Sequence, residues 1–560
     1  VTGAFRISPK LEAMLAFTRR DGKETDLDNA RIGADALQNC TRNPEATPCN
    51  EFDPTVSQSN NVLSKLVYHV SDTNQLRLTG EYFTRQTRVD QNAVLGSDGT
   101  SDIHLYQHEQ NVERWRLSVD QDWLLETQGW LDRVKWQVSY SPQNIDRYGD
   151  RYRTIIASGD QERRISDQDY EETFIEADLQ FESSFDLGAT THVLTYGFDG
   201  DYATTDYNRE DTTYNLTTGT TTIARAGGFN FADADTTRAD LYLQDEISFM
   251  EGRLRITPGV RFSNYIIDPK TDGDYQLVPG AEPEKKTAHD LQFKLGAIYD
   301  ITDVYSVYGQ FAQGFKMPTA QQLFQSLDSL PAFALVPNPN LEPESVDSYE
   351  LGFRGDFGNK GYFSINGFVA KYKDFIQNFI DANPVDYGLP LGTMVLTYDN
   401  ADSLNLWGIE ASGAYQINDN FSTRAALSYQ KGKIENDGVS TTYNGALPLQ
   451  LVTGIRYIEP EHGFDIELVG TFQAGASDVA NPATEFQPSG YAVFDILAGW
   501  KPVPNLTLRA GLMNIFDTRY FGPDTRGFPI NGSDAVKRTN PIELQTAPGR
   551  SFKVGLSYDF

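Results

Sequence analysis

The chain has 560 residues and a formal net charge of −31, with 39% hydrophobic and 12% aromatic residues. Such an acidic chain is not expected to bind nucleic acid, because a phosphate backbone demands clustered Lys and Arg. Mean hydropathy is −0.47, and the absence of a run of roughly 20 apolar residues excludes transmembrane helices. A transmembrane β-barrel remains possible, since lumen-facing and lipid-facing residues alternate in its strands.

The N-terminal region starts at Val1 in strand-like sequence, without Met or a signal peptide. We therefore expect an N-terminal part to precede it. Further along, Cys40 and Cys49 lie in a polar, proline-containing stretch, and their closeness suggests a local disulfide. A disulfide implies an oxidising compartment such as the periplasm or the cell surface. Two free thiols are the alternative, and the spacing excludes a CxxC zinc or redox motif.

Three histidines fall on the side of the chain that we expect to be extracellular: His104, His108 and His289. In a helical turn His104 and His108 would share one face, and a neutral imidazole is a ready iron ligand. The alternative is that they are exposed polar side chains. The other three histidines fall near the expected periplasmic ends of strands: His69, His192 and His462.

No sequence motif typical of an enzyme is complete in this chain. The sequence from His108 begins like the metalloprotease motif HExxH but lacks the second His, and a strand fits it better than a helix. We find no nucleophile elbow, phosphate-binding glycine loop or Cys/His zinc cluster. We therefore predict that the protein is not an enzyme and holds no permanent cofactor; a metal site cannot be assigned.

Alternating strands joined by turns run to the C-terminus. Apolar side chains from Phe552 to Phe560 alternate with polar or small ones, a period of two that predicts a strand. We expect Leu508, Leu556 and Tyr558 to face lipid, and Arg509 and Lys553 to face the lumen. Short turns are expected at 71–74, 250–252, 301–303, 357–360, 418–420 and 502–505. Long polar connections are expected at 40–60, 144–169, 206–235, 319–345 and 522–546.

Short turns on one side and long loops on the other are typical of an outer-membrane barrel. We count about 21 strands, and bacterial single-chain barrels have even strand numbers. The predicted fold is therefore all-β, a transmembrane antiparallel β-barrel of about 22 strands in the intact protein. Residues 1–560 would be the barrel domain, with the first strand and a plug domain preceding Val1.

Several motifs in the second half resemble those of the TonB-dependent receptors, and within them the haem/haemoglobin receptor branch. The strand that leads through Phe315 to Pro318 is similar to the family's Phe-Arg-Ala-Pro box. An Asn-Pro-Asn-Leu box follows, formed by Asn338, Pro339, Asn340 and Leu341. Further landmarks are similar at 406–410, 514–517, 520, 526–527 and 547–550. Receptors of this branch carry an iron-ligating His between the two boxes, whereas residues 319–337 contain none.

The resemblance implies a bacterial outer-membrane receptor that imports an iron-containing ligand by TonB-coupled gating, with haem as the favoured cargo. Implied partners are outer-membrane lipid, the TonB complex through the N-terminal region, and the ligand or a haem-carrying protein. Alternatives are a transporter of a ferric siderophore, cobalamin or a glycan, and a passive porin or adhesin barrel. The expected ligand-binding residues are His104, His108, His289, Met317, Phe324 and Phe333.

Overall fold

The structure is a computed structural model. It describes residues 1–27, 49–125, 130–225, 232–275, 277–278, 281–329, 333–389, 391, 393–476, 478–530 and 539–559. Cys49 is disulfide-bonded; Cys40 lies outside the described residues, as does Phe560. Within the described residues, none of the helices has the length and apolar character needed to cross a bilayer.

In the described part of the chain, one sheet contains 26 strands. Their bounds are β1 Thr2–Ser8, β2 Leu11–Lys23, β3 Thr55–Ser71, β4 Asn74–Asp90, β5 Gly96–Ser97, β6 Ser101–Leu124, β7 Arg133–Ile155, β8 Gln161–Leu187, β9 Thr190–Asn215, β10 Thr220–Arg225, β11 Asp233–Phe249, β12 Leu254–Lys270, β13 Lys286–Asp300, β14 Tyr305–Lys316, β15 Leu327–Ser329, β16 Phe333–Leu335, β17 Glu344–Asp356, β18 Gly361–Ala382, β19 Met394–Gln416, β20 Phe421–Asn436, β21 Val439–Thr442, β22 Gln450–Glu459, β23 Phe464–Gln473, β24 Tyr491–Val503, β25 Leu506–Met513 and β26 Ser551–Tyr558. The described helices are short: α1 Ala320–Phe324, and the 3₁₀ helices Asn92–Val94, Met250–Gly252, Gly358–Lys360, Pro384–Tyr387, Pro523–Thr525 and Ile542–Gln545.

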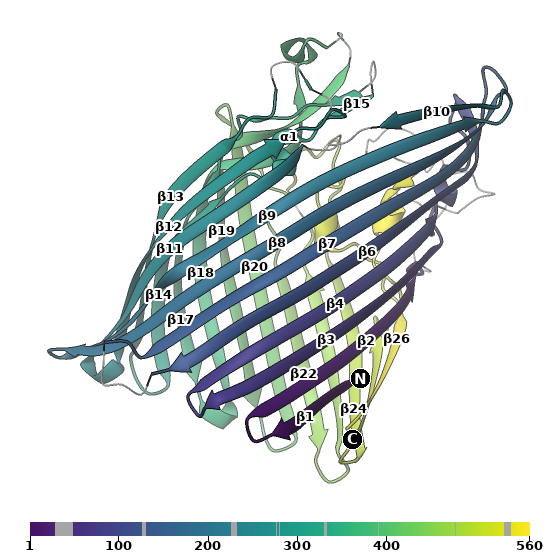
Figure 1. Cartoon of the computed structure of the whole chain (residues 1–560). Coiled ribbons are helices and arrows are strands. Elements are labelled where there is room, and N and C mark those ends of the chain that lie inside the picture. The colour runs from purple at the N-terminus through teal and green to yellow at the C-terminus, as the bar shows by residue number, and fades with distance from the viewer. Residues whose placement is uncertain are drawn as a thin grey trace.

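The wall of the molecule is a meander of antiparallel strands. Of the 26 described strands, five are short pieces inside connections (β5, β10, β15, β16 and β21), which leaves 21 in the wall. Each wall strand pairs antiparallel with the next along the chain, from β1 with β2 to β25 with β26. Figure 1 shows these tilted strands wrapping round into a barrel. The predicted all-β fold and strand count are confirmed for the described residues.

All six predicted tight turns lie where two wall strands meet. β3 ends at Ser71 and β4 begins at Asn74, and the five other turns likewise separate strands by two to four residues. Because a hairpin reverses the chain, these turns all lie at one end of the barrel (Figure 1). By the short-turn rule for outer-membrane barrels this is the periplasmic end. The histidines His69, His192 and His462 lie near it, as predicted.

The wall strands carry apolar side chains outward and polar ones inward. On β17 the outward side chains are large exposed hydrophobic residues: Tyr349, Leu351 and Phe353. Between them, Glu350 accepts a hydrogen bond from Tyr308 Oη at 3.3 Å, and Arg354 donates one to Ser306 Oγ at 2.8 Å. This alternation gives the lipid an apolar surface and gives the lumen a polar one.

The final hairpin has the register that the alternation predicts. Leu508 pairs with Leu556, and Arg509 with Gly555. Arg509 and Lys553 line a hollow on the inner face, whereas the Leu556 side chain is exposed on the outer face. A shift of one residue would exchange the two faces, so the pairing itself keeps Arg509 out of the lipid.

Charged side chains on the inner face are paired between strands. Arg238 of β11 forms ion pairs with Asp199 at 2.7 Å and Asp240 at 2.8 Å, and also contacts Asp201. Arg261 of β12 contacts Asp240 at 2.6 Å and Asp199 as well. The two guanidinium groups supply the positive charge that the nearly buried Asp240 carboxylate needs.

Two connections that were predicted to be long loops are instead mostly strand. The stretch 144–169 belongs to β7 and β8 except for the turn at 156–160. The described residues of 206–235 lie largely in β9, β10 and β11. Strands β6 to β9 are therefore among the longest in the wall and continue to the end of the barrel where β10 lies (Figure 1).

The sequence pattern does not predict these strand extensions, because they lie beyond the lipid bilayer. On β6 the continuous run of outward apolar side chains ends at Trp115, and the next outward residues are Glu113, Asn111 and Glu109. Trp115 donates to Glu113 at 2.9 Å, and Asn111 to Glu109 at 3.3 Å. Above this level water covers both faces of the sheet. Polar residues then suit both faces, and the period of two that identifies a membrane strand disappears.

Because one face of the wall meets lipid and the other the lumen, a new charge should destabilise the barrel on the outer face and not on the inner one. Replacing the outward Leu351 by Arg should destabilise the folded barrel by about 2–4 kcal/mol, because the guanidinium would lie in hydrocarbon. Gln310 of β14 offers a matched control, since it pairs with Glu350, the residue next to Leu351. Gln310→Arg points into the lumen and should be nearly neutral. Urea unfolding in lipid vesicles measures both; equal losses would contradict the assignment of faces.

Candidate functional site

The connection between β14 and β17 contains a capped helix in its first described part and, in its second, a strand that pairs with the wall. Its first part contains α1, which Thr319 caps: Gln322 N donates to Thr319 Oγ1 at 3.2 Å, and Thr319 N donates to Gln322 Oε1 at 3.0 Å. Its second part contains β16, which pairs parallel with the start of β19. The connection therefore adds structure at the extracellular end of the barrel, where α1 and β15 lie (Figure 1).

The Asn-Pro-Asn-Leu box closes this connection onto β19. Asn338 Nδ2 donates to the carbonyl of Tyr398 at 2.9 Å, and Asn338 Oδ1 accepts from Asn340 N at 3.1 Å. Just beyond the box, Asn400 Oδ1 accepts from Glu342 N at 2.8 Å, and Asn400 Nδ2 donates to the Glu342 carbonyl at 3.0 Å. These side-chain amides replace the ladder that a proline-containing segment cannot form.

Apolar side chains of the connection pack against the inner wall. Leu323, Phe324 and Leu341 are fully buried in one cluster that also includes Tyr207 and Ile267 of the wall. The Phe324 carbonyl accepts a hydrogen bond from Tyr275 Oη at 2.7 Å. Burial raises the pKa of Tyr275 to about 12, so the phenol keeps the proton that it donates at neutral pH. Phe324, a predicted ligand contact, is thus enclosed by protein in this structure.

A cavity of about 640 Å³ lies on the inner face beside the docked connection. Aromatic and apolar side chains form much of its lining: Tyr170, Phe174, Tyr207, Tyr265, Ile267 and Met317. Polar groups such as Arg147 and Glu172 also border it. A concave space of this size, with an apolar lining and a few polar groups, is typical of a small-molecule site.

Of the predicted ligand-binding residues, Met317 lines the cavity. Phe315 of the first box contacts Tyr265, with ring centroids 5.8 Å apart, and Pro318 borders the cavity as well. The Phe333 backbone belongs to β16, but its side chain lies outside the described residues. The tyrosines were not predicted: Tyr207 lies in the stretch 206–235 that was expected to be a loop, and Tyr170 directly follows the stretch 144–169.

His104 and His108 lie on opposite faces of β6. His104 Nε2 lies 2.8 Å from Thr154 Oγ1, whereas the His108 ring lies over Gly149, where an added Cβ would be 3.6 Å from its Cε1. Positions 149 and 154 of β7 have opposite parity, so their side chains point to opposite faces. The cause is a β-bulge in β6 between Ile103 and Leu105, which shifts the alternation by one residue.

Only His108 of the three predicted histidines shares a face with the cavity. Gly149, over which it lies, is two residues from the cavity-lining Arg147 on the same strand. His289 is exposed and lies near Phe262, an outward side chain of β12, with ring centroids 6.5 Å apart. Burial lowers the pKa of His108, so its imidazole is neutral at pH 7 and able to ligate a metal.

Landmarks of the C-terminal third hold extracellular loops together. Arg526 is buried and donates to the Asp478 carbonyl through Nε at 2.9 Å and to the Ala446 carbonyl through Nη1. These three residues come from the connections after β25, β23 and β20, respectively. Gly527, the next residue, has a φ of +78°, and a Cβ there would lie 2.3 Å from Asn444 Nδ2. The Arg-Gly pair is therefore required for joining the loops.

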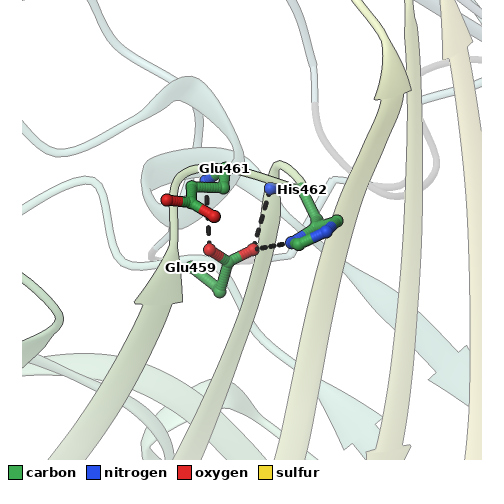
Figure 2. A group of neighbouring side chains, drawn as sticks. All are labelled: Glu459, Glu461 and His462. Atoms are coloured by element: carbon green, nitrogen blue, oxygen red, sulfur yellow. Dashed lines mark hydrogen bonds and ion pairs between the residues drawn. The ribbon is translucent and has the colours of Figure 1, made fainter.

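A group of Glu459, Glu461 and His462 closes the turn between β22 and β23 (Figure 2). The Glu459 carboxylate accepts from Glu461 N at 3.1 Å, and from His462 N and Nδ1, both at 2.8 Å. These bonds, first of all that from His462 N, lower the pKa of Glu459. Each side chain could offer one ligand atom to a cation. The turn is, however, at the opposite end of the barrel from the cavity.

Comparison with known proteins identifies the family. The model of the TonB dependent receptor-like β-barrel matches residues 63–515. Hemoglobin-haptoglobin utilization protein B of Neisseria meningitidis serogroup A is 26% identical over 98% of this chain and 75% of its own length.

Solved structures share the architecture. The copper transporter OprC superimposes with a TM-score of 0.69 at 15% identity, covering 98% of this chain and 76% of its own. A double mutant of the haemophore receptor HasR of Serratia marcescens, in complex with haemophore HasA and haem, has a TM-score of 0.68 at 16% identity, covering 100% and 77%. At such identities these structures show the fold alone.

The chain belongs to the TonB-dependent receptor β-barrel family. It is therefore a transport receptor of the bacterial outer membrane and not an enzyme.

The docking of the β14–β17 connection can be tested at Asn400. Asn400→Ala removes hydrogen bonds to Glu342 and to the Asp374 carbonyl, each contributing about 1 kcal/mol. Amide exchange at 338–342 should become at least tenfold faster, while the wall strands stay protected. Asn405→Ala, an exposed position on the same strand, is the control. Equal exchange in both variants would show that the amide does not hold the box.

Proposed function

We propose that this receptor imports haem across the outer membrane, driven by the TonB complex, and obtains it from haemoglobin or another haem-carrying protein. The cavity beside the docked connection carries the proposal. It offers a planar ligand the rings of Tyr170, Phe174, Tyr207 and Tyr265. An aromatic contact contributes about 0.5–1.5 kcal/mol beyond the apolar area that it buries, which favours a flat, largely apolar molecule such as a porphyrin.

The relatives support haem as the cargo. One is named for haemoglobin–haptoglobin utilisation, and HasR was solved with a haemophore and haem. OprC, with a similar wall, is named a copper transporter. Because the same wall serves different cargoes in these proteins, the choice of ligand is expected to depend on the inner-face side chains and loops.

Tyr265 is the best-placed iron ligand in the cavity. The connection offers no His between the two boxes, and a tyrosine oxygen is an established type of haem ligand. Tyr207 Oη already donates to Gln168 Oε1 at 3.3 Å, and Tyr170 interacts with Glu172. Among the described residues Tyr265 Oη has no hydrogen-bond partner. Met317 and His108 are the two other candidates on this face.

The proposal predicts a spectroscopic signature at Tyr265. In the full-length receptor, Tyr265→Phe should shift the Soret band of bound hemin and weaken binding at least tenfold, because it removes only the ligating oxygen. Tyr202→Phe is the matched control: Tyr202 is exposed on the outer face of β9 and should leave spectrum and affinity unchanged. A hemin titration followed by absorption measures both.

Other outcomes would show whether the assigned iron-ligating residue or the assigned cargo is wrong. If His108→Ala or Met317→Leu shifts the Soret band and Tyr265→Phe does not, haem is still the cargo but its ligand is another residue. His104→Ala and His289→Ala, on the outer face, should have no effect. If the unmodified receptor produces no Soret change with hemin, the haem proposal is wrong, and a ferric siderophore becomes the better candidate.

A further inference from the structure

Five arginines follow the inner face of the strand extensions above the cavity, and we call them the arginine ladder: Arg147, Arg151 and Arg153 on β7, Arg164 on β8 and Arg209 on β9. Arg147 lines the cavity. Arg151 and Arg153 follow it at even spacing on one strand and therefore share its face. Arg164 of β8 is paired directly opposite Arg151 of β7.

The ladder has more cations than its neighbouring carboxylates can neutralise. Glu162 pairs with Arg153 at 2.9 Å. Asp211 pairs with both Arg164, at 2.5 Å, and Arg209, at 3.0 Å. Within the described chain, Arg147 and Arg151 form no ion pair. Among the described residues, only two carboxylates therefore form ion pairs with the five guanidinium groups, in a protein whose formal net charge is −31.

Arg151 is held in an unfavourable position. It lies directly opposite Arg164, and like charges at such a cross-strand position are destabilising. Its Nε is buried without a hydrogen-bond acceptor among the described residues, and its guanidinium group lies over the Tyr106 ring, 5.8 Å from the centroid. Burial, and after it the charge of Arg153, lower the pKa of Arg151. An anion at this place would offset the repulsion from Arg153 and Arg164 and could accept a hydrogen bond from the buried Nε.

The position between the two unpaired arginines carries no side chain. Gly149 separates Arg147 from Arg151 on the same face, and an added Cβ there would touch Ser166 Cβ at 3.5 Å and His108 Cε1 at 3.6 Å. Because position 149 has no side chain, no side chain of β7 stands between the two guanidinium groups, and the His108 ring lies beside them. A carboxylate on the inner face at this level could be bound by two guanidinium groups, which present planar forks of N–H donors suited to its two oxygens.

We propose that the arginine ladder binds carboxylate groups of the imported ligand, with Arg147 and Arg151 as the two residues left free for them. The proposal rests on the import function for the identity of the cargo, since haem carries two propionates on one edge. The ring would then contact the aromatic side chains of the cavity, and the propionates would point to the ladder. The ladder's place on the inner face favours a ligand that enters the barrel over a lipid headgroup outside it.

The test compares hemin with its dimethyl ester, which has the same ring but no carboxylates. In the full-length receptor, Arg151→Gln and Arg147→Gln should each weaken hemin binding about tenfold and leave binding of the ester unchanged. Arg163→Gln is the matched control, because Arg163 pairs with Asp150 on the outer face at the same level. Without ligand, Arg151→Gln should melt at a temperature equal to or higher than that of the unmodified receptor.

The outcomes test the arginine-ladder proposal separately from the haem-import proposal. Unchanged hemin affinity in Arg151→Gln and Arg147→Gln, or equal losses for hemin and the ester, would overturn the ladder proposal while haem import stands. If hemin does not bind at all, the haem-import proposal is wrong. The arginine ladder is then tested with citrate as the carboxylate probe, at constant ionic strength. Citrate should then raise the melting temperature of the unmodified receptor and not that of Arg151→Gln; equal shifts, or none, would overturn the ladder.

Discussion

Backbone hydrogen bonding in a medium without water is the constraint on which the rest of this structure depends. In hydrocarbon every peptide group must find a partner within the protein, and the meander provides one by pairing each wall strand with its neighbours in the chain. That pairing assigns alternate residues to lipid and to lumen. The lumen therefore receives a polar set of side chains that the ladders hold in fixed rows.

At the extracellular end of the barrel, the connections are held by side-chain hydrogen bonds and packing instead of by strand pairing. Asn338 and Asn400 bond to backbone groups of the β14–β17 connection and of the wall, and Leu341 and Phe324 bury their side chains against it. Across the C-terminal loops, Arg526 does the same through carbonyl groups. The family landmarks of this chain thus have structural roles: they hold connections in place. This leaves recognition to residues outside them, such as Tyr265 and Arg147.

Electrostatics divide the inner face into two regions. At the level of Arg238 and Arg261, two cations lie among three carboxylates, Asp199, Asp201 and Asp240, so every positive charge in that region is paired within the wall. Above it, the arginine ladder is not neutralised, and Arg151 directly faces Arg164. A local conflict of this kind, in a protein rich in carboxylates, is expected at a functional site, where stability gives way to binding.

The amino-acid sequence by itself determined the barrel fold, the tight turns and the register of the last hairpin. These features depend on local turn chemistry and on the period of two that lipid imposes on one face, for example at Leu508 and Arg509. It did not reveal the extensions of β7 and β8, because above Trp115 water covers both faces and the period is lost. Nor did it separate His104 from His108, since a single bulged residue reverses their faces. The cavity was decided only by tertiary structure: Tyr170, Tyr207, Tyr265 and Met317 come from distant segments, and only strand pairing and a docked connection bring them together.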